Sequence, residues 1–363
     1  MKKILLVDDS ALMRRVFCDI LKLDGRFFVE DEAVNGVEAL ELLSKKEYDG
    51  VILDVNMPKM DGLQLLRELQ NRNIKARVLM ASTTTNEGSK NTLDALELGA
   101  LDFIHKPDWS FKCKDDAFKT QLLGTLEAVC NSKITASVVK PTVSAKDNSN
   151  MKTVHEIVRK NSSKFKGEKI VAIAVSTGGP RSLQNVIPYL PADLNAPVVI
   201  VQHMPQGFTE SFAERLDSMS EVKVCEGKEG EIVKKGCVYI AKAGLHLNLV
   251  RAGRETQIHY TQESYREGVR PCANYMYESL IDSSYDEVVS VVMTGMGADG
   301  TEGIRNLKNS GKATFVITQD SDSCVVYGMP KACDKAGLSD ESITLTKIAQ
   351  EIVLHVGVKS DGC

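Results

Sequence analysis

The first 130 residues alternate short apolar runs with segments of helical periodicity. Five apolar runs predict strands, at residues 3–7, 28–33, 50–53, 76–81 and 101–104. Between these runs, apolar residues recur every three or four positions, which is the spacing of an amphipathic helix. Repeated strand–helix units of this size are typical of a doubly wound α/β domain with a parallel sheet. We therefore predict such a domain, of the flavodoxin-like type, over residues 1–130.

The pattern fades from residue 131 to 167, where Ser, Thr, Lys and Asn dominate, and we interpret this segment as an exposed linker that contains a short helix at 154–158. Strands and helices alternate again over residues 168–358, which predicts a second doubly wound, Rossmann-like α/β domain. Four further short runs, at 222–225, 237–241, 246–250 and 257–260, predict a small antiparallel insert within this second domain.

Three apolar strands of the second domain end in residues of acyl-transfer chemistry. The run at 170–175 ends in Ser176-Thr177-Gly178-Gly179-Pro180, the run at 198–202 in His203, and the run at 288–293 in a loop that contains Asp299. The carboxyl ends of parallel strands form the ligand edge of such a sheet. A hydroxyl, an imidazole and a carboxylate at this edge suit a nucleophile, a base and an orienting acid.

A phosphate cradle is the alternative interpretation of the turn after Ser176. Neither a Gly-x-Gly-x-x-Gly motif nor a Walker lysine accompanies that turn, and this favours the hydrolase interpretation. The chain order Ser–His–Asp differs from that of α/β-hydrolases and from both main orders of serine proteases, and the Gly-x-Ser-x-Gly motif is missing as well.

The first domain carries a different set of side chains at its strand ends. Asp8 and Asp9 follow the first strand, Asp54 ends the third, Ser82 ends the fourth, and Lys106 follows the fifth. Several carboxylates at one edge suit Mg²⁺, which prefers a few hard oxygen ligands. A carboxylate that attacks phosphorus becomes an acyl phosphate, whose oxygens a lysine and a hydroxyl can hold. The pattern predicts a phosphoryl-accepting metal site.

Composition indicates which partners and which cellular location to expect for both domains. The net charge of −4 over 363 residues disfavours nucleic acid and membrane surfaces as main partners. Nine cysteines without a Cys-x-x-Cys pair indicate reduced thiols, as in a cytoplasmic protein. The first apolar run stops at Val7, which is too short for a signal peptide, and no run approaches the 18 apolar residues of a membrane span. We expect a cytoplasmic location without membrane insertion.

The first domain resembles the response-regulator receiver family over essentially its whole length. The matching motifs are Val7-Asp8-Asp9-Ser10, residues 54–62 and Phe103-Ile104-His105-Lys106-Pro107. The resemblance implies that Asp54 accepts the phosphoryl group from a histidine kinase. It implies Mg²⁺ binding by Asp9, by Asp8 through water, by Asp54 and by the carbonyl of Asn56. Ser82 and Phe103 match the switch residues of that family, whereas His105 and Trp109 match no functional position.

The second domain resembles the CheB methylesterase catalytic domain from about residue 169 to 355. The matching motifs are residues 176–180, 202–208, 211–216, 294–300 and 323–330. The resemblance implies a Ser176–His203–Asp299 triad, an oxyanion donor near Met296, support from Thr177, and no cofactor in this domain. It implies hydrolysis of glutamate methyl esters on methylated chemoreceptors, with release of methanol, and deamidation of certain glutamines. It also implies a monomer in which the unphosphorylated receiver covers the approach to Ser176.

Some loop residues depart from the motifs of that family. Lys242-Ala243 replaces the usual proline and glycine, Cys272 and Asn274 lie where Pro-Ser-Val-Asp is usual, and Val175 replaces an alanine. We expect these changes to affect substrate preference more than catalysis, and we interpret His246 and His259 as ordinary strand residues. The alternative function is a non-catalytic signalling module whose second domain only binds a partner, which the complete Ser/His/Asp set disfavours.

Overall fold

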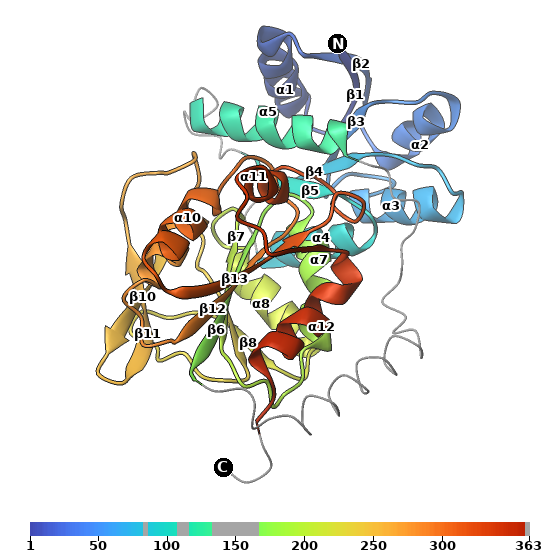
Figure 1. Cartoon of the computed structure of the whole chain (residues 1–363). Coiled ribbons are helices and arrows are strands. Elements are labelled where there is room, and N and C mark those ends of the chain that lie inside the picture. The colour runs from blue at the N-terminus through green and yellow to red at the C-terminus, as the bar shows by residue number, and fades with distance from the viewer. Residues whose placement is uncertain (83–85, 107–115, 133–166, 360–363) are drawn as a thin grey trace. The chain divides into compact units, whose positions relative to one another are not determined.

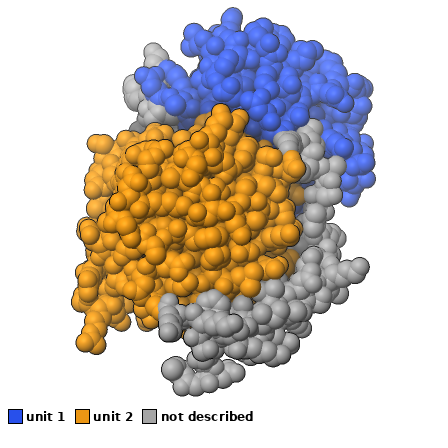
Figure 2. Space-filling view, in the orientation of Figure 1, with its two compact units in different colours: residues 1–138 blue, residues 139–363 orange. Residues whose placement is uncertain are grey.

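A computed structural model of the protein describes residues 1–82, 86–106, 116–132 and 167–359 (Figure 1). The chain divides into two compact units, residues 1–138 and 139–363 (Figure 2), and each is described by itself. Most of the predicted linker, its short helix at 154–158, and Trp109 lie outside the described residues. Among the described helices, none is both long enough and apolar enough to span a membrane.

The first unit contains a five-stranded sheet in the order β2-β1-β3-β4-β5, in which all four strand pairs are parallel. Its strands are β1 (Lys2–Val7), β2 (Phe27–Ala33), β3 (Gly50–Asp54), β4 (Val78–Ser82) and β5 (Asp102–His105). Every residue of β3 and β4 is buried, as expected for central strands covered by helices on both faces. The predicted parallel α/β domain is therefore confirmed, with strand ends within two residues of those expected.

Local capping explains where the helices of this unit begin. The Ser10 hydroxyl accepts the Met13 N–H at the start of α1 (Ala11–Asp24), and Asn35 caps α2 (Gly36–Lys45). Asp61 and Gln64 form a capping box at the start of α3 (Gly62–Asn71). The helices α4 (Asn86–Glu97) and α5 (Asp116–Asn131) complete the unit. The Ser10 and Asp61 caps follow Asp8-Asp9 and Asp54 in the chain, so they fix the loops after β1 and β3 that begin at these acidic residues.

The second unit is built on a seven-stranded sheet in the order β14-β13-β12-β6-β7-β9-β8. Its strands are β6 (Lys169–Val175), β7 (Val198–Gln202), β8 (Lys223–Glu226), β9 (Cys237–Ile240), β12 (Glu287–Val292), β13 (Ala313–Gln319) and β14 (Glu341–Ile343). All of its strand pairs are parallel. From β6 the chain first builds one side of the sheet and then returns to build the other, so β6 lies at the switch point where such folds bind ligands.

Helices cover this sheet as the apolar alternation requires (Figure 1). Ile170, Ala172 and Ala174 of β6 face a core that includes residues of α9 (Ala273–Ser279), α10 (Thr301–Asn309) and α11 (Met329–Lys335). Residues on the other face, with α12 (Leu345–Val356), are equally buried. The remaining elements are α7 (Gly179–Gln184), the 3₁₀ turn η3 (Ile187–Tyr189) and α8 (Thr209–Ser218). The central strands are thus enclosed, and only their ends remain for chemistry.

The predicted antiparallel insert is half as large as expected. Only β10 (His246–Ala252) and β11 (Glu255–Thr261) form an antiparallel pair, whereas β8 and β9 belong to the main sheet as parallel neighbours. The prediction was wrong for β8 and β9, because two short apolar runs do not reveal whether their pairing is parallel or antiparallel. In the structure the connection at 227–236 runs back beside β11, with hydrogen bonds from Gly230 N–H to Ile258 O and from Val233 N–H to Thr256 O.

Candidate functional site

The three predicted triad residues lie at the carboxyl ends of three adjacent strands. Ser176 directly follows β6, His203 directly follows β7, and Asp299 lies in the loop between β12 and α10. The strands β12, β6 and β7 are neighbours at the centre of the sheet, and the His203 N–H donates to Val175 O at 3.2 Å. The sheet therefore gathers these residues at one edge, as predicted from the strand pattern.

Backbone hydrogen bonds hold the turn that carries Ser176. The Ser176 N–H donates to Thr294 O at 3.0 Å, and the Ser176 carbonyl accepts the Gly179 N–H at 2.7 Å. Gly178 has a φ of 76°, in the left-handed region that favours glycine. A Cβ on Gly295 would lie 2.8 Å from the Ser176 Cβ, so a glycine is needed beside the serine. Ser176 therefore occupies a tight and closely packed turn.

His203 and Asp299 form a hydrogen-bonded pair in which Asp299 is buried and His203 is partly buried. The His203 Nε2 lies 2.8 Å from Asp299 Oδ2, and the two side chains are 12% and 2% exposed. A carboxylate only accepts hydrogen bonds, so the proton of a neutral imidazole lies on Nε2 in this arrangement. The Nδ1 atom then carries the lone pair, and it is the ring atom that remains available as a base.

Three further donors surround the Asp299 carboxylate. Ala273 N–H donates to Oδ2 at 2.7 Å, Asn274 N–H donates to Oδ1 at 3.0 Å, and the Cys272 thiol donates to Oδ1 at 2.9 Å. Burial acts to raise the pKa of Asp299, but the hydrogen bonds from His203, Cys272 and Ala273 outweigh burial, and the pKa lies below its ordinary value. The carboxylate is therefore held ionised in a buried position.

Sequence reasoning missed several residues that support this site. The Gln202 side-chain amide donates from Nε2 to the carbonyl oxygens of Ser176 and His203, both at 3.1 Å. The Thr294 hydroxyl donates to Thr177 O at 3.0 Å. Gln202 and Thr294 lie within the motifs quoted above, directly before His203 and Gly295, but a motif does not reveal what its polar residues contact. The contacts of Cys272 depend on tertiary packing and left no signal in the local pattern.

The predicted oxyanion and support residues lie at the same edge. Thr177 is 5% exposed and follows the serine, whereas the Met296 side chain is 45% exposed. Among the described residues, the Met296 backbone N–H has no hydrogen-bond acceptor. His246 and His259 lie in β10 and β11, as expected of strand residues; His246 is buried and His259 pairs with Glu229 at 2.8 Å.

The first unit brings together its predicted acidic residues. One carboxylate oxygen from each of Asp8, Asp9 and Asp54 lies within 4.8 Å of the others. Asp8 and Asp54 are buried, and Lys106 Nζ lies 2.7 Å from Asp8 Oδ2 and 2.8 Å from Asp54 Oδ1. Three hard oxygen donors at this separation fit a Mg²⁺ ion, and the lysine balances part of their charge.

Burial sets the acidity of Asp54. It raises the pKa of this carboxyl from 3.8 to about 6, and the Lys106 ammonium offsets only part of that effect. Ser82 is buried at the end of β4, Phe103 is buried as the second residue of β5, and Asn56 is exposed two residues after Asp54. Of the seven predicted positions, all but Phe103 therefore lie at the carboxyl edge of the sheet or in the loops that follow it.

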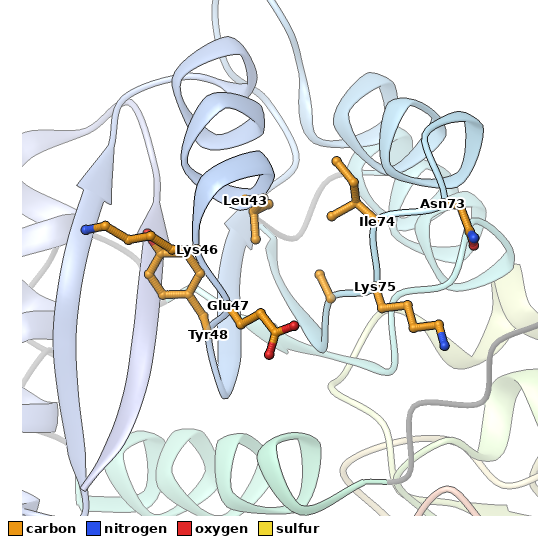
Figure 3. A pocket seen from close by; sticks show the side chains of 8 residues that line it. Leu43, Lys46, Glu47, Tyr48, Asn73, Ile74 and Lys75 are labelled. Carbon is orange, nitrogen blue, oxygen red and sulfur yellow. The ribbon is translucent and has the colours of Figure 1, made fainter.

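A hollow of about 290 Å³ lies away from both sites (Figure 3). It lies beside the amino ends of β3 and β4, whereas the acidic cluster follows the carboxyl ends of strands in that sheet. Within the hollow, Lys46 and Tyr48 are engaged by Asp31, at 2.8 and 2.6 Å. Its other lining residues are Leu43, Glu47, Asn73, Ile74, Lys75 and Ala76. No residue of either predicted site lines this hollow.

Comparisons with known proteins agree with the division into two units. Residues 4–110 match the model of the response regulator receiver domain, and residues 171–352 match that of the CheB methylesterase. The fold and the two sites thus define a receiver-linked α/β protein of the esterase type. With the relatives described next, these matches show that the chain belongs to the CheB methylesterase family, in the form that carries an amino-terminal receiver.

Relatives match the chain over nearly its full length. A protein from Halalkalibacterium halodurans is 41% identical over 97% of both chains, and one from Bacillus subtilis is 40% identical over 97% of this chain and 98% of its own. Both are named protein-glutamate methylesterase/protein-glutamine glutaminase. The crystal structure of the Thermotoga maritima CheB methylesterase catalytic domain is 41% identical, with a TM-score of 0.50, and covers 52% of this chain and 98% of its own.

Proposed function

We propose that this protein hydrolyses glutamate methyl esters on chemoreceptors, releasing methanol, and that it deamidates specific receptor glutamines by the same chemistry. The observation that carries the proposal is the hydrogen-bonded His203–Asp299 pair at the strand edge beside Ser176, in a chain of the methylesterase family. An ester and an amide differ here only in the leaving group, so one acyl-transfer site serves both reactions.

In the proposed mechanism, the Ser176 oxygen attacks the ester carbonyl while His203 Nδ1 takes the serine proton. Asp299 keeps the other ring nitrogen protonated and stabilises the imidazolium that forms. The imidazolium then protonates the departing methoxide, which leaves as methanol, and the acyl group remains on Ser176. Water attacks this acyl-enzyme with the same base, which regenerates the serine and leaves a glutamate carboxylate. With a glutamine substrate, ammonia leaves in place of methanol.

The negative charge on the tetrahedral oxygen needs preorganised donors. We assign this role to the backbone N–H of Met296, because that group has no acceptor among the described residues and lies in the loop beside Ser176. Thr177 supports the turn: its carbonyl is held by the Thr294 hydroxyl, and its side chain is buried next to the nucleophile.

The receiver unit is proposed to regulate this reaction through phosphorylation of Asp54 by a histidine kinase. Asp8, Asp9, Asp54 and the Asn56 carbonyl would hold Mg²⁺, which neutralises charge during phosphoryl transfer. Lys106 already contacts Asp54 and would hold a phosphoryl oxygen, and Ser82 would hold another. Ser82 and Phe103 would then change position and transmit the phosphorylated state to the rest of the unit.

Hydrolysis of methyl-labelled receptor tests the proposal directly. Wild-type protein should release labelled methanol, and a small phosphodonor with Mg²⁺ should raise the rate. An Asp54→Asn variant should keep the basal rate but lose the response to phosphodonor, because its amide does not form an acyl phosphate. Binding of receptor without methanol release would instead support a non-catalytic partner-binding module.

A further inference from the structure

The N-cap Cys272 and the first two residues of α9 surround the Asp299 carboxylate. The Cys272 thiol and the Asn274 N–H donate to Oδ1, while the Ala273 N–H and His203 donate to Oδ2. Both carboxylate oxygens therefore accept two hydrogen bonds. Cys272 provides the one side-chain donor among the three that come from this segment.

Several contacts fix the Cys272 thiol in this position. Its side chain is fully buried, and its backbone N–H donates to His246 Nδ1 at 3.2 Å. Asn274 contacts the start of α10. Its side-chain Oδ1 accepts the N–H groups of Gly300, at 3.1 Å, and of Gly303, at 2.7 Å. The start of α9 thus holds Asp299 through its carboxylate and through the peptide that follows it.

We propose that Cys272 is a positioning residue of the hydrolase site, whose thiol holds the Asp299 carboxylate in the orientation that meets His203. Only the expected effect of Cys272 on turnover rests on the proposed function. The contact between Cys272 and Asp299 does not depend on the identity of the substrate.

Burial and the neighbouring carboxylate hold the thiol in its protonated, donating form. Both raise the pKa of Cys272 far above the ordinary thiol range. Burial lowers the pKa of His246, which keeps its Nδ1 free to accept. Burial likewise raises the pKa of Tyr277, which stays neutral. Among the described residues, His203 contacts this carboxylate, Tyr277 interacts electrostatically with it, and Arg266 interacts electrostatically with the thiol. His246 contacts only the backbone N–H of Cys272.

Two substitutions separate the hydrogen bond from the packing. Cys272→Ala removes the donor, and Cys272→Ser restores a donor of similar size. Cys333→Ala is the matched control, because Cys333 is also fully buried but its thiol contacts Thr301 Oγ1 at 3.5 Å. With one donor fewer, the Asp299 carboxylate is held less firmly, so its hydrogen bond with His203 Nε2 should change in Cys272→Ala.

Two readouts test this inference. The NMR resonance of the His203 Nε2 proton, assigned with a His203→Gln variant, needs no substrate and reports the hydrogen bond to Asp299; it should shift in Cys272→Ala and return toward its wild-type position in Cys272→Ser. Methyl-ester hydrolysis should fall roughly five- to thirtyfold in Cys272→Ala and recover in Cys272→Ser.

The outcomes are distinguishable. If Cys272→Ala matches Cys333→Ala in its His203 resonance and in its turnover, the thiol only fills space and the inference is wrong. If wild-type protein releases no methanol but the His203 resonance still differs between the variants as expected, the proposed function fails while the positioning role stands.

Discussion

At the scale of single residues, the two ring nitrogens of His203 differ in their contacts. Nε2 lies 2.8 Å from Asp299, and in the proposed mechanism Nδ1 would take the Ser176 proton. Asp299 is buried, and the donors around it keep it ionised. An ionised carboxylate in a poorly solvated position would favour the imidazolium formed during attack. In this mechanism each of the three residues depends on the other two.

This interdependence predicts how substitutions combine. Ser176→Ala should leave the fold intact and lower methyl-ester hydrolysis by about 10⁴-fold or more, since triad members act as a unit. His203→Ala should cause a similar loss, and the double variant should be little worse than either single variant. Initial rates on labelled receptor, with circular dichroism as the folding control, provide the comparison. Near-native turnover by Ser176→Ala would rule out this nucleophile.

The buried position of Asp54 predicts a pH dependence of metal binding. Because its pKa is raised to about 6, the free carboxyl is protonated below that pH and ionised above it. A metal ligand must be deprotonated, so Mg²⁺ binding should release about half a proton from Asp54 at pH 6 and almost none at pH 8. Affinity should correspondingly fall as the pH drops below 6.

Calorimetry in buffers of different ionisation enthalpy measures this proton release. The Asp54→Asn variant is the control, because it lacks the titrating group and should release no proton from this position at pH 6. Equal proton release by wild type and by Asp54→Asn would show that another group titrates when the metal binds.

At the scale of elements, the sequence predicts buried strands well and their pairing poorly. The strands β6, β7 and β12 are continuous apolar runs, and their predicted ends agree with the structure within one residue. Ser176, His203 and Asp299 follow from those ends. In contrast, β8 and β9 are short, and their parallel pairing depends on β9 lying between β7 and β8. The local sequence pattern does not reveal this order of strands in the sheet.

The same limit explains why Cys272 and Asn274 were recognised only as departures from a motif. They contact Asp299 because α9 packs against α10, and that contact joins residues about 25 positions apart. Gly303 makes the close approach possible. A Cβ on Gly303 would lie 2.6 Å from Asn274 O and 2.7 Å from Asn274 Cα, which is too close for either backbone to remain in place.

We therefore expect Gly303→Ala to push α10 away from α9. Alanine stabilises a helix interior relative to glycine, so a net loss of stability in Gly303→Ala would come from the close contact with Asn274. The free energy of unfolding should fall by roughly 1–3 kcal/mol, as is typical of overpacking, and hydrolysis should fall with it as Asp299 moves. Denaturant titration of the full chain measures the stability.

Gly227→Ala, directly after β8, is the control for a glycine whose added Cβ can be accommodated. Its Cβ would meet the Ile258 Cδ1 atom, the end of a flexible side chain that can move aside. If Gly303→Ala proves as stable and as active as Gly227→Ala, close packing of α9 on α10 is not what holds Asp299.

At the scale of the whole molecule, the chain joins two units with separate sites. Each unit has its own parallel sheet and its own site at the carboxyl edge. If residues 131–167 act as the predicted linker, they would keep the receiver at a high effective concentration relative to the hydrolase, so a weak restraint on the hydrolase would have a large effect. A tenfold change in activity needs only about 1.4 kcal/mol of differential stabilisation.

Removal of the receiver is the direct test of that restraint. If the unphosphorylated receiver lowers access to Ser176, a protein that begins near residue 151 should hydrolyse methyl esters faster than the unphosphorylated full-length chain. The shortened protein should also lose every response to phosphodonor, because Asp54 is gone. Its folding is checked first by thermal unfolding and by inhibition with a serine-directed reagent. A folded hydrolase unit slower than the unphosphorylated whole would mean that the receiver assists catalysis, and that simple inhibition is the wrong description of its role.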